Sequence, residues 1–258
     1  MDISAAGLRV LVTAGAAGIG LSIAKTFADA GASVFVCDID RDALQTLRST
    51  QPNIGTSYAD VSRPHDVAAL FDEAVAFLGG LDVLVNNAGI AGPTAKVEEI
   101  STDDWDKTIA VDLNSMFYCT RLAVPLLKSA GGGSIINLSS VAGRLGFPLR
   151  TPYSAAKWGV VGFTKSLAIE LGPSNIRVNA IQPGVVEGER IDRVISARAE
   201  ARGIDKEESK KQYTAPISLG RMISPQDIAN MALFLATPAG ASISGQALSV
   251  CGDHGYLA

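Results

Sequence analysis

Short apolar runs alternate with longer segments of helical periodicity along the whole chain. The apolar runs predict β-strands at 8–13, 33–38, 83–86, 134–139, 176–181 and 247–250, with a further short strand that ends near Asp60. Apolar residues at helical spacing predict helices at 19–30, 41–49, 64–78, 102–128, 152–171 and 225–236, and the charged segment 187–212 is also helix-prone.

The predicted strands are apolar on both faces and are separated by helices. Both features are typical of a parallel sheet that helices cover on its two faces. No internal repeat and no Pro- or Ser-rich linker interrupts the pattern. We therefore predict the α/β class: a single doubly wound, Rossmann-like domain over residues 1–258, with a parallel sheet of about seven strands.

The composition suits one domain of this size. The chain has 258 residues, of which 47% are hydrophobic, and this is enough for a substantial core. Its formal net charge is −4 with no long run of one sign, so we expect no nucleic-acid partner. No apolar stretch reaches the roughly 20 residues of a membrane span, and the N-terminus lacks the pattern of a secretory signal. We expect no membrane association and a cytoplasmic location.

The cysteines and histidines point to no further chemistry. Cys37, Cys119 and Cys251 are scattered and odd in number, which favours buried, reduced thiols over a disulfide framework. His65 and His254 have no partner at metal-ligand spacing, so we expect both at the surface and predict no metal site.

A glycine-rich turn follows the first predicted strand, which ends at Thr13. The turn and the start of the next helix contain Gly15, Ala17, Gly18, Ile19 and Gly20. Glycines here let the backbone turn sharply and approach a pyrophosphate, and the helix then directs its N-terminal N–H groups and positive dipole end at that phosphate. The spacing differs from the usual dinucleotide fingerprint, so the turn alone is weak evidence for a nucleotide site.

Acidic and amide side chains follow the next predicted strands. Asp38 ends the second strand, where a carboxylate accepts hydrogen bonds from the adenosine ribose hydroxyls and repels a 2′-phosphate, which favours NAD over NADP. The alternative for Asp38 is a cap of the helix that starts near Asp40. The expected cleft between strands of reversed order is lined by Asp60, Val61, Asn87, Ala88 and Gly89.

Tyr153 and Lys157 are four residues apart on one predicted helix and therefore share a face. A tyrosine with a pKa of about 10 is a poor base at neutral pH, and a nearby lysine cation favours its phenolate. Tyr153 is then a general base in alcohol oxidation and a general acid in ketone reduction. Ser140, thirteen residues upstream of Tyr153 in the sequence, is positioned to bind the substrate oxygen. Taken alone, a Tyr-x-x-x-Lys pair is more often an ordinary helix-surface pair.

These motifs, in this order, resemble the short-chain dehydrogenase/reductase family over nearly the whole chain. The matching pieces are the turn from Thr13 to Gly20, Asp60, Asn86-Asn87-Ala88-Gly89, Asn114, Ser140, Tyr153-x-x-x-Lys157 and Pro183-Gly184. The resemblance implies catalytic roles for Asn114, Ser140, Tyr153 and Lys157. It implies that Lys157 holds the nicotinamide ribose and that Asn114 positions a water linking Lys157 to solvent. Ser139 is the rival of Ser140, but the spacing favours Ser140.

The same resemblance implies further features. Pro183, Gly184 and Val186 are expected to contact the cofactor, residues 187–214 to form a lid over the substrate, and the protein to be a homotetramer. The first surfaces to expect in contact are the helices at 102–128 and 152–171, which carry Trp105 and Trp158 in the core or at the interface.

Three positions depart from the family pattern. Ala14 stands where the first glycine of the turn is usual, and Gly188 stands where a threonine often holds the nicotinamide end of the cofactor. Cys251 replaces the usual acidic residue after the last strand, and simple packing is the favoured interpretation of this change.

The loop between Ser140 and Tyr153 carries the candidate substrate contacts Arg144, Phe147 and Arg150. An arginine there pairs with a carboxylate, sulfonate or phosphate of the substrate, or packs at the surface or at a subunit contact. The segment 187–214 is a solvated helical face, or its apolar residues Ile191, Val194 and Ile195 face the cleft. These features favour a small polar substrate, namely a sugar, a polyol or a hydroxy acid.

The predicted function is therefore an NAD(H)-dependent oxidoreductase that interconverts a secondary alcohol and a ketone. The general pattern equally resembles 3-oxoacyl thioester reductases and hydroxybutyrate dehydrogenases, and steroid or other carbonyl reductases are further alternatives. Epimerisation or dehydration through a transient ketone uses the same tyrosine and lysine. A dinucleotide-sensing protein without catalysis is the alternative of a different class.

Overall fold

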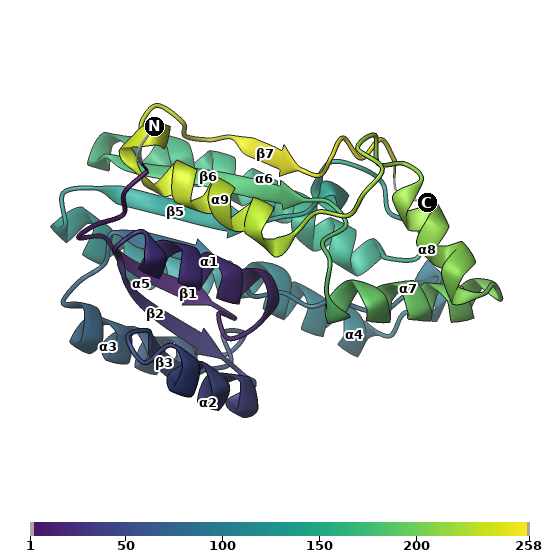
Figure 1. Ribbon diagram of the computed structural model, residues 1–258, viewed down its shortest axis with the longest axis horizontal. Helices are drawn as coiled ribbons and strands as arrows, with labels where there is room; N and C mark the ends of the chain where they lie inside the picture. The colour runs from purple at the N-terminus through teal and green to yellow at the C-terminus, as the bar shows by residue number, and fades with distance from the viewer. Residues whose placement is uncertain (1–2, 257–258) are drawn as a thin grey trace.

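In the computed structural model, which describes residues 3–256, one twisted parallel sheet runs through the middle of the molecule (Figure 1). The seven strands lie in the order β3-β2-β1-β4-β5-β6-β7, and all neighbouring strands are parallel. The order reverses between β1 and β4, which in doubly wound sheets is the place where ligands bind. The predicted fold class is confirmed.

The elements follow the predicted pattern closely. The strands are β1 (Arg9–Thr13), β2 (Ser33–Asp38), β3 (Gly55–Tyr58), β4 (Val83–Asn86), β5 (Gly133–Leu138), β6 (Ile176–Pro183) and β7 (Ala247–Val250). The helices are α1 (Gly18–Asp29), α2 (Arg41–Thr50), α3 (Pro64–Leu78), α4 (Thr102–Ile109), α5 (Ser115–Ser129), α6 (Thr151–Leu171), α7 (Glu189–Arg202), α8 (Lys206–Thr214) and α9 (Pro225–Ala236).

Two apolar clusters fill the space between the sheet and its helices. On one face, Ile23 and Phe27 of α1 pack with Leu44 of α2 and Leu235 of α9 against the strands. On the other face, apolar side chains of α3, α5 and α6 pack against the opposite side of the same strands. The strands are buried on both sides, which explains why they appear as continuous apolar runs in the sequence.

The predicted single helix at 102–128 is wrong in one respect. A π-helical segment, Ala110–Asn114, separates α4 from α5. Such segments insert an extra residue into a helix and are frequent at functional sites. Here the altered turn contains Asp112, whose side chain is fully buried beneath the cleft.

The charged segment predicted as one helix-prone stretch forms two helices. Gly203, with a φ of +63°, ends α7 in the left-handed conformation, and Asp205 caps the start of α8 through the N–H of Glu208. Both helices lie beyond the end of the sheet toward which the strand arrows point (Figure 1). They therefore stand over the edge of the sheet that carries the predicted site.

Candidate active site

The glycine turn is held closed by contacts from the loop after β4. The Asn87 side-chain amide donates to the carbonyls of Thr13 and Ala14, both at 3.0 Å, and the Thr13 hydroxyl accepts from the N–H groups of Asn87 and Ala88. A Cβ on Gly20 would lie 2.1 Å from the Ala14 carbonyl oxygen, so the closeness of turn and helix requires glycine there.

The departure at Ala14 has a structural consequence. Ala14 adopts a φ of +50°, in the left-handed region that glycine tolerates and alanine does not favour. The turn is therefore built without the first glycine, at the cost of backbone strain at one residue.

Asp38 lies at the carboxyl end of β2, next to the turn. Its two carboxylate oxygens accept from the N–H groups of Ala16 and Asp40, both at 3.1 Å. Asp40, not Asp38, is the side-chain cap of α2, through the N–H groups of Asp42 and Ala43. The alternative interpretation of Asp38 as a helix cap is therefore not what the structure shows.

The other predicted cofactor residues surround the same edge of the sheet. Asp60 accepts from the N–H and the hydroxyl of Ser62, and Val61 is buried in the core. Helix α1 starts at Gly18 with no side-chain cap, which leaves its first N–H groups free of side-chain partners. The turn, the uncapped helix and Asp38 fit the pyrophosphate and ribose of a dinucleotide.

The three central residues of the prediction come together. Lys157 is buried, and its Nζ donates to the Leu138 carbonyl at 3.0 Å and lies 5.6 Å from the centre of the Tyr153 ring. The Ser140 hydroxyl accepts from the Ala142 N–H at 3.1 Å and also acts to lower the pKa of Tyr153. The hydroxyl of Ser139, by contrast, donates to the Lys157 carbonyl at 2.8 Å and so faces helix α6 rather than the tyrosine.

The surroundings of Tyr153 favour its phenolate. Burial acts to raise the pKa of Tyr153, and the Asp112 carboxylate acts in the same direction. The cations of Arg190 and Lys157 and the hydrogen bond with Ser140 outweigh both, and the pKa of Tyr153 is below its usual value. A lowered tyrosine pKa is what general acid–base chemistry near neutral pH requires.

Asp112 is a site residue that sequence reasoning missed. Its side chain is fully buried, with one carboxylate oxygen accepting from the Ile90 N–H at 2.6 Å and the other 3.7 Å from Lys157 Nζ. Asn114, the predicted residue two positions later, is half-buried, and no hydrogen bond of its side chain is found within residues 3–256. The signal in the sequence was an acidic residue in an otherwise apolar helical segment.

The loop before Tyr153 places its two arginines differently. The Arg144 guanidinium turns toward the C-terminal segment, where it donates to the His254 carbonyl at 2.9 Å. Arg150 is only 3% exposed, and its guanidinium carbon lies 5.1 Å from the ring centres of both Phe147 and Tyr153. Of the two, Arg150 is the one beside the proposed catalytic residue.

Helices α7 and α8 cover this loop. Ile195 is fully buried, Val194 and Tyr213 nearly so, and Phe147 packs edge-on against Tyr213 with ring centres 6.4 Å apart. Arg190 of α7 donates to the Gly89 carbonyl at 3.2 Å and lies over the Tyr153 ring. The segment is thus packed onto the cleft rather than being a fully solvated face.

The segments after β6 and β7 contain Gly188 and Cys251, the other two departures from the family pattern. A Cβ on Gly184 would lie 2.8 Å from the Cys251 Cα, and Cys251 is buried, in keeping with a packing role. Gly188 opens α7 with a φ of +131°, which a threonine would rarely adopt. Pro183 ends β6, and Val186 bridges to Ile223.

The expectation of two surface histidines is half wrong. His65 is exposed, whereas His254 is only 1% exposed, and burial lowers its pKa. The C-terminal segment folds back onto residues 216–218, as the bridge between Ile217 and His254 shows, and this tertiary contact covers the ring. The three cysteines are buried and unpaired, as predicted.

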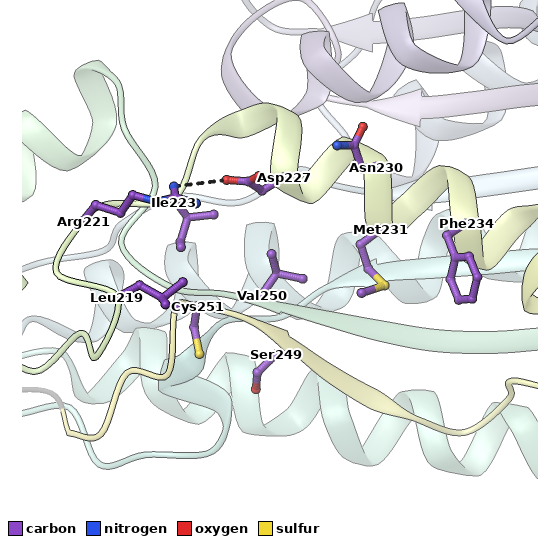
Figure 2. Close-up of a pocket in the computed structure, with 11 residues that line it drawn as sticks. Leu219, Arg221, Ile223, Asp227, Asn230, Met231, Phe234, Ser249, Val250 and Cys251 are labelled. Atoms are coloured by element: carbon purple, nitrogen blue, oxygen red, sulfur yellow. Dashed lines mark ion pairs between the residues drawn. The ribbon is translucent and has the colours of Figure 1, made fainter. Parts of the chain in front are cut away.

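A groove of about 520 Å³ lies between α9 and the end of β7 (Figure 2). Arg221 and Asp227 form an ion pair of 3.7 Å at one end of it. It contains none of the predicted catalytic residues, and its lining is Leu219, Arg221, Ile223, Asp227, Asn230, Met231, Phe234, Ser249, Val250, Cys251 and Gly252.

Known proteins resemble this chain over nearly its full length. Residues 14–256 match the family described as enoyl-(acyl carrier protein) reductase. The D-beta-hydroxybutyrate dehydrogenase of Cupriavidus necator is 35% identical, with 98% of each chain covered. The chain belongs to the short-chain dehydrogenase/reductase family. It is therefore an oxidoreductase that acts on CH–OH groups with a nicotinamide dinucleotide.

Solved structures of the family agree on the fold. An actinorhodin polyketide ketoreductase with NADPH superposes with a TM-score of 0.92 at 34% identity, covering 99% of this chain and 98% of the other. A 7α-hydroxysteroid dehydrogenase complexed with NADH and 7-oxo glycochenodeoxycholic acid gives a TM-score of 0.89 at 33% identity, covering 99% and 96%. The neighbours thus include both NADH- and NADPH-binding proteins.

None of the helices within residues 3–256 combines the length and the apolar character needed to cross a bilayer. No group of three or more His, Cys, Asp or Glu side chains in the same range is arranged to hold a metal ion.

Proposed function

We propose that this protein is an NAD(H)-dependent dehydrogenase that interconverts a secondary alcohol and a ketone on a small polar substrate. The observation that carries the proposal is the position of Tyr153 beside the cations of Lys157 and Arg190, which lie 5.6 and 5.9 Å from its ring centre and lower its pKa. The residues that fit a dinucleotide lie at the same edge of the sheet. When bound, the nicotinamide supplies the hydride acceptor or donor.

Tyr153, Ser140 and Lys157 have different proposed roles in the transfer of the proton. Tyr153 takes the hydroxyl proton of the alcohol during oxidation and returns a proton to the ketone oxygen during reduction. Ser140 orients the substrate oxygen by hydrogen bonding. Lys157, fixed by the Leu138 carbonyl, keeps its positive charge near Tyr153 and holds the nicotinamide ribose. Asn114 retains its proposed role of positioning a water.

NAD is the proposed cofactor rather than NADP. The Asp38 carboxylate is anchored by the N–H groups of Ala16 and Asp40 at the end of β2, which fixes a negative charge there. A fixed carboxylate accepts hydrogen bonds from two ribose hydroxyls and repels a 2′-phosphate. The proposed cofactor contacts otherwise are Gly15, Ala17, Gly18, Ile19, Gly20, Asp60, Val61, Asn87, Ala88, Gly89, Tyr153, Lys157, Pro183, Gly184 and Val186.

The segment 187–214 is proposed as the substrate lid. It rests on Phe147 through Tyr213 and on Gly89 through Arg190, so it closes over Tyr153 by a small number of contacts. Glycines with positive φ stand at Gly188 and Gly203, the two ends of α7. These are suitable positions for a change of backbone direction on opening.

A homotetramer in the cytoplasm is the proposed state. Large apolar side chains lie exposed on α4, α5 and α6, namely Trp105, Phe117, Trp158 and Ile169, with Ile169 81% exposed. Exposed apolar groups of this size favour burial between copies. Light scattering after gel filtration tests the assembly. A monomer would remove this part of the proposal, and Trp158→Glu is expected to weaken a tetramer if α6 forms its contacts.

The test of the function is NADH fluorescence with purified protein and NAD. The substrates are sugars and polyols, hydroxy acids, 3-hydroxyacyl thioesters and hydroxysteroids, each also run with Tyr153→Phe. Saturable NADH formation with one class, reduced by about 100-fold or more in the variant, supports the proposal. Undiminished turnover by Tyr153→Phe would refute the role of Tyr153. Turnover by NADP at a rate equal to NAD would refute the cofactor preference.

A further inference from the structure

Arg150 is a buried cation without a counter-ion. Its residue is 3% exposed, its Nη2 donates to the Ala91 carbonyl, and its Nε has no partner among the described residues. None of the salt bridges found within residues 3–256 includes Arg150. A guanidinium carries five N–H donors, and leaving them desolvated and unpaired is costly. The position therefore has unused capacity to bind an anion.

Cations outnumber carboxylates around Tyr153. The charged groups of Arg150, Lys157 and Arg190 lie 5.1, 5.6 and 5.9 Å from the centre of its ring. The acidic side chain that acts on Tyr153 is Asp112, and its carboxylate is paired with Lys157 at 3.7 Å. Within residues 3–256, the Arg150 and Arg190 guanidinium groups donate to the carbonyls of Ala91 and Gly89, Arg150 also interacts with the Tyr213 hydroxyl, and no carboxylate pairs with either arginine. The surroundings of Tyr153 are therefore positively charged before any substrate binds.

Aromatic side chains pack beside Arg150. Phe147 and Tyr213 pack against each other beside Arg150, and Arg198 behind them lies over the Tyr213 ring at 4.8 Å. Arg150 stands over the same tyrosine ring that the substrate oxygen must approach. An anion in contact with Arg150 is therefore separated by only a few carbon–carbon bonds of about 1.5 Å each from the reacting carbon.

We propose that Arg150, assisted by Arg190, binds the carboxylate of a short-chain hydroxy or oxo acid and so determines the substrate class. The inference rests on the proposed function, whose catalytic residue the carboxylate would lie beside. A carboxylate fits because its planar pair of oxygens matches the N–H groups of a guanidinium. A thioester or steroid has no negative group so near its carbonyl carbon and would leave Arg150 unpaired.

The experiment compares acids with their neutral amides. Protein saturated with NADH, which cannot accept a hydride, is titrated with glycolate, lactate or 3-hydroxybutyrate and with the matching primary amides. Dissociation constants come from calorimetry and NADH fluorescence. We expect at least one acid to bind about 10- to 100-fold more tightly than its amide, since hydrogen bonds to charged groups are worth that much.

Four variants separate the loss of a positive charge from a general disturbance of the fold. Arg150→Gln is expected to abolish the preference for the acid, and Arg150→Lys to retain part of it. Arg190→Gln is expected to reduce the preference without abolishing it. Arg193→Gln is the matched control, because Arg193 is on the same helix α7 but 75% exposed and faces Glu189. Its preference should equal that of the natural sequence, and thermal melting verifies that each variant is folded.

The outcomes decide the anion site and the proposed function separately. Binding of no acid, equal binding of acid and amide, or an unchanged preference in folded Arg150→Gln would overturn the anion site. NADH binding and Tyr153-dependent turnover of a neutral alcohol would then leave the proposed function standing. The same titrations without cofactor test whether the anion site exists even if the NAD-dependent function is wrong. Preference for an acid in a protein that does not bind NADH would support the anion site and reject the NAD-dependent function.

Discussion

Replacing Asp112 by Asn should move the pH dependence of catalysis to lower pH. The Asp112 carboxylate acts to raise the pKa of Tyr153, against Arg190 and Lys157. The substitution keeps the shape of the side chain and an oxygen that can accept from the Ile90 N–H. It removes a negative charge that is buried together with Lys157. The phenolate of Tyr153 should therefore form more readily in the variant.

The size of the effect follows from two distances. Asp112 lies 3.7 Å from Lys157 Nζ, which in turn lies 5.6 Å from the centre of the Tyr153 ring. The carboxylate is therefore within about 9 Å of the ring, where a unit charge contributes about 1.8 kcal/mol at an effective dielectric constant of about 20. This free energy makes the formation of the phenolate about 20-fold more favourable in the variant.

The assay is the pH profile of kcat/KM for alcohol oxidation, followed as NADH formation. In the proposed mechanism oxidation needs the unprotonated Tyr153, so the rate should rise with pH through its pKa. The variant should reach its plateau about one pH unit earlier. Asp106→Asn removes the same charge from an exposed position of α4 and should leave the profile unchanged. A profile of Asp112→Asn that stays in place or moves to higher pH would refute the reasoning.

Three further changes have defined outcomes. Ala14→Gly should raise the free energy of unfolding in urea by about 0.5–1 kcal/mol, because Ala14 has a φ of +50°; a lower stability would contradict the strain at this residue. Asp38→Asn should shift the ratio of kcat/KM values for NAD and NADP by about 10- to 100-fold toward NADP, and an unchanged ratio would show that Asp38 does not select the cofactor. Asp82→Asn should cost about 1–2 kcal/mol of stability at neutral pH, since Arg9 binds both Asp82 oxygens at 2.7 and 2.8 Å. Burial acts to raise the pKa of Asp82, but the contacts with Arg9 outweigh burial and lower the pKa. The stability difference between the natural protein and Asp82→Asn should therefore disappear as the pH falls below about 4. A stability difference that persists in acid would contradict the role of this ion pair.

The sequence by itself determined the fold and the local geometry of the proposed site. Strands buried on both faces leave apolar runs, and helices that cover them leave a helical period, so both are visible without coordinates. Tyr153 and Lys157 share a face because helical geometry alone relates positions four apart. The turn after β1 and Asp38 after β2 are likewise local features, each fixed by where a strand ends.

Tertiary structure decided what distant segments do to these residues. The partner of Lys157 is Asp112, 45 positions away in the sequence, and it reaches the lysine from the π-helical segment between α4 and α5. Arg150 becomes a buried cation only because α7, α8 and the Ala91 carbonyl close around it, and His254 is buried only because the C-terminal segment folds back. The burial and the charge pairing of a side chain depend on contacts between segments far apart in the chain. Local periodicity in the sequence does not specify these contacts.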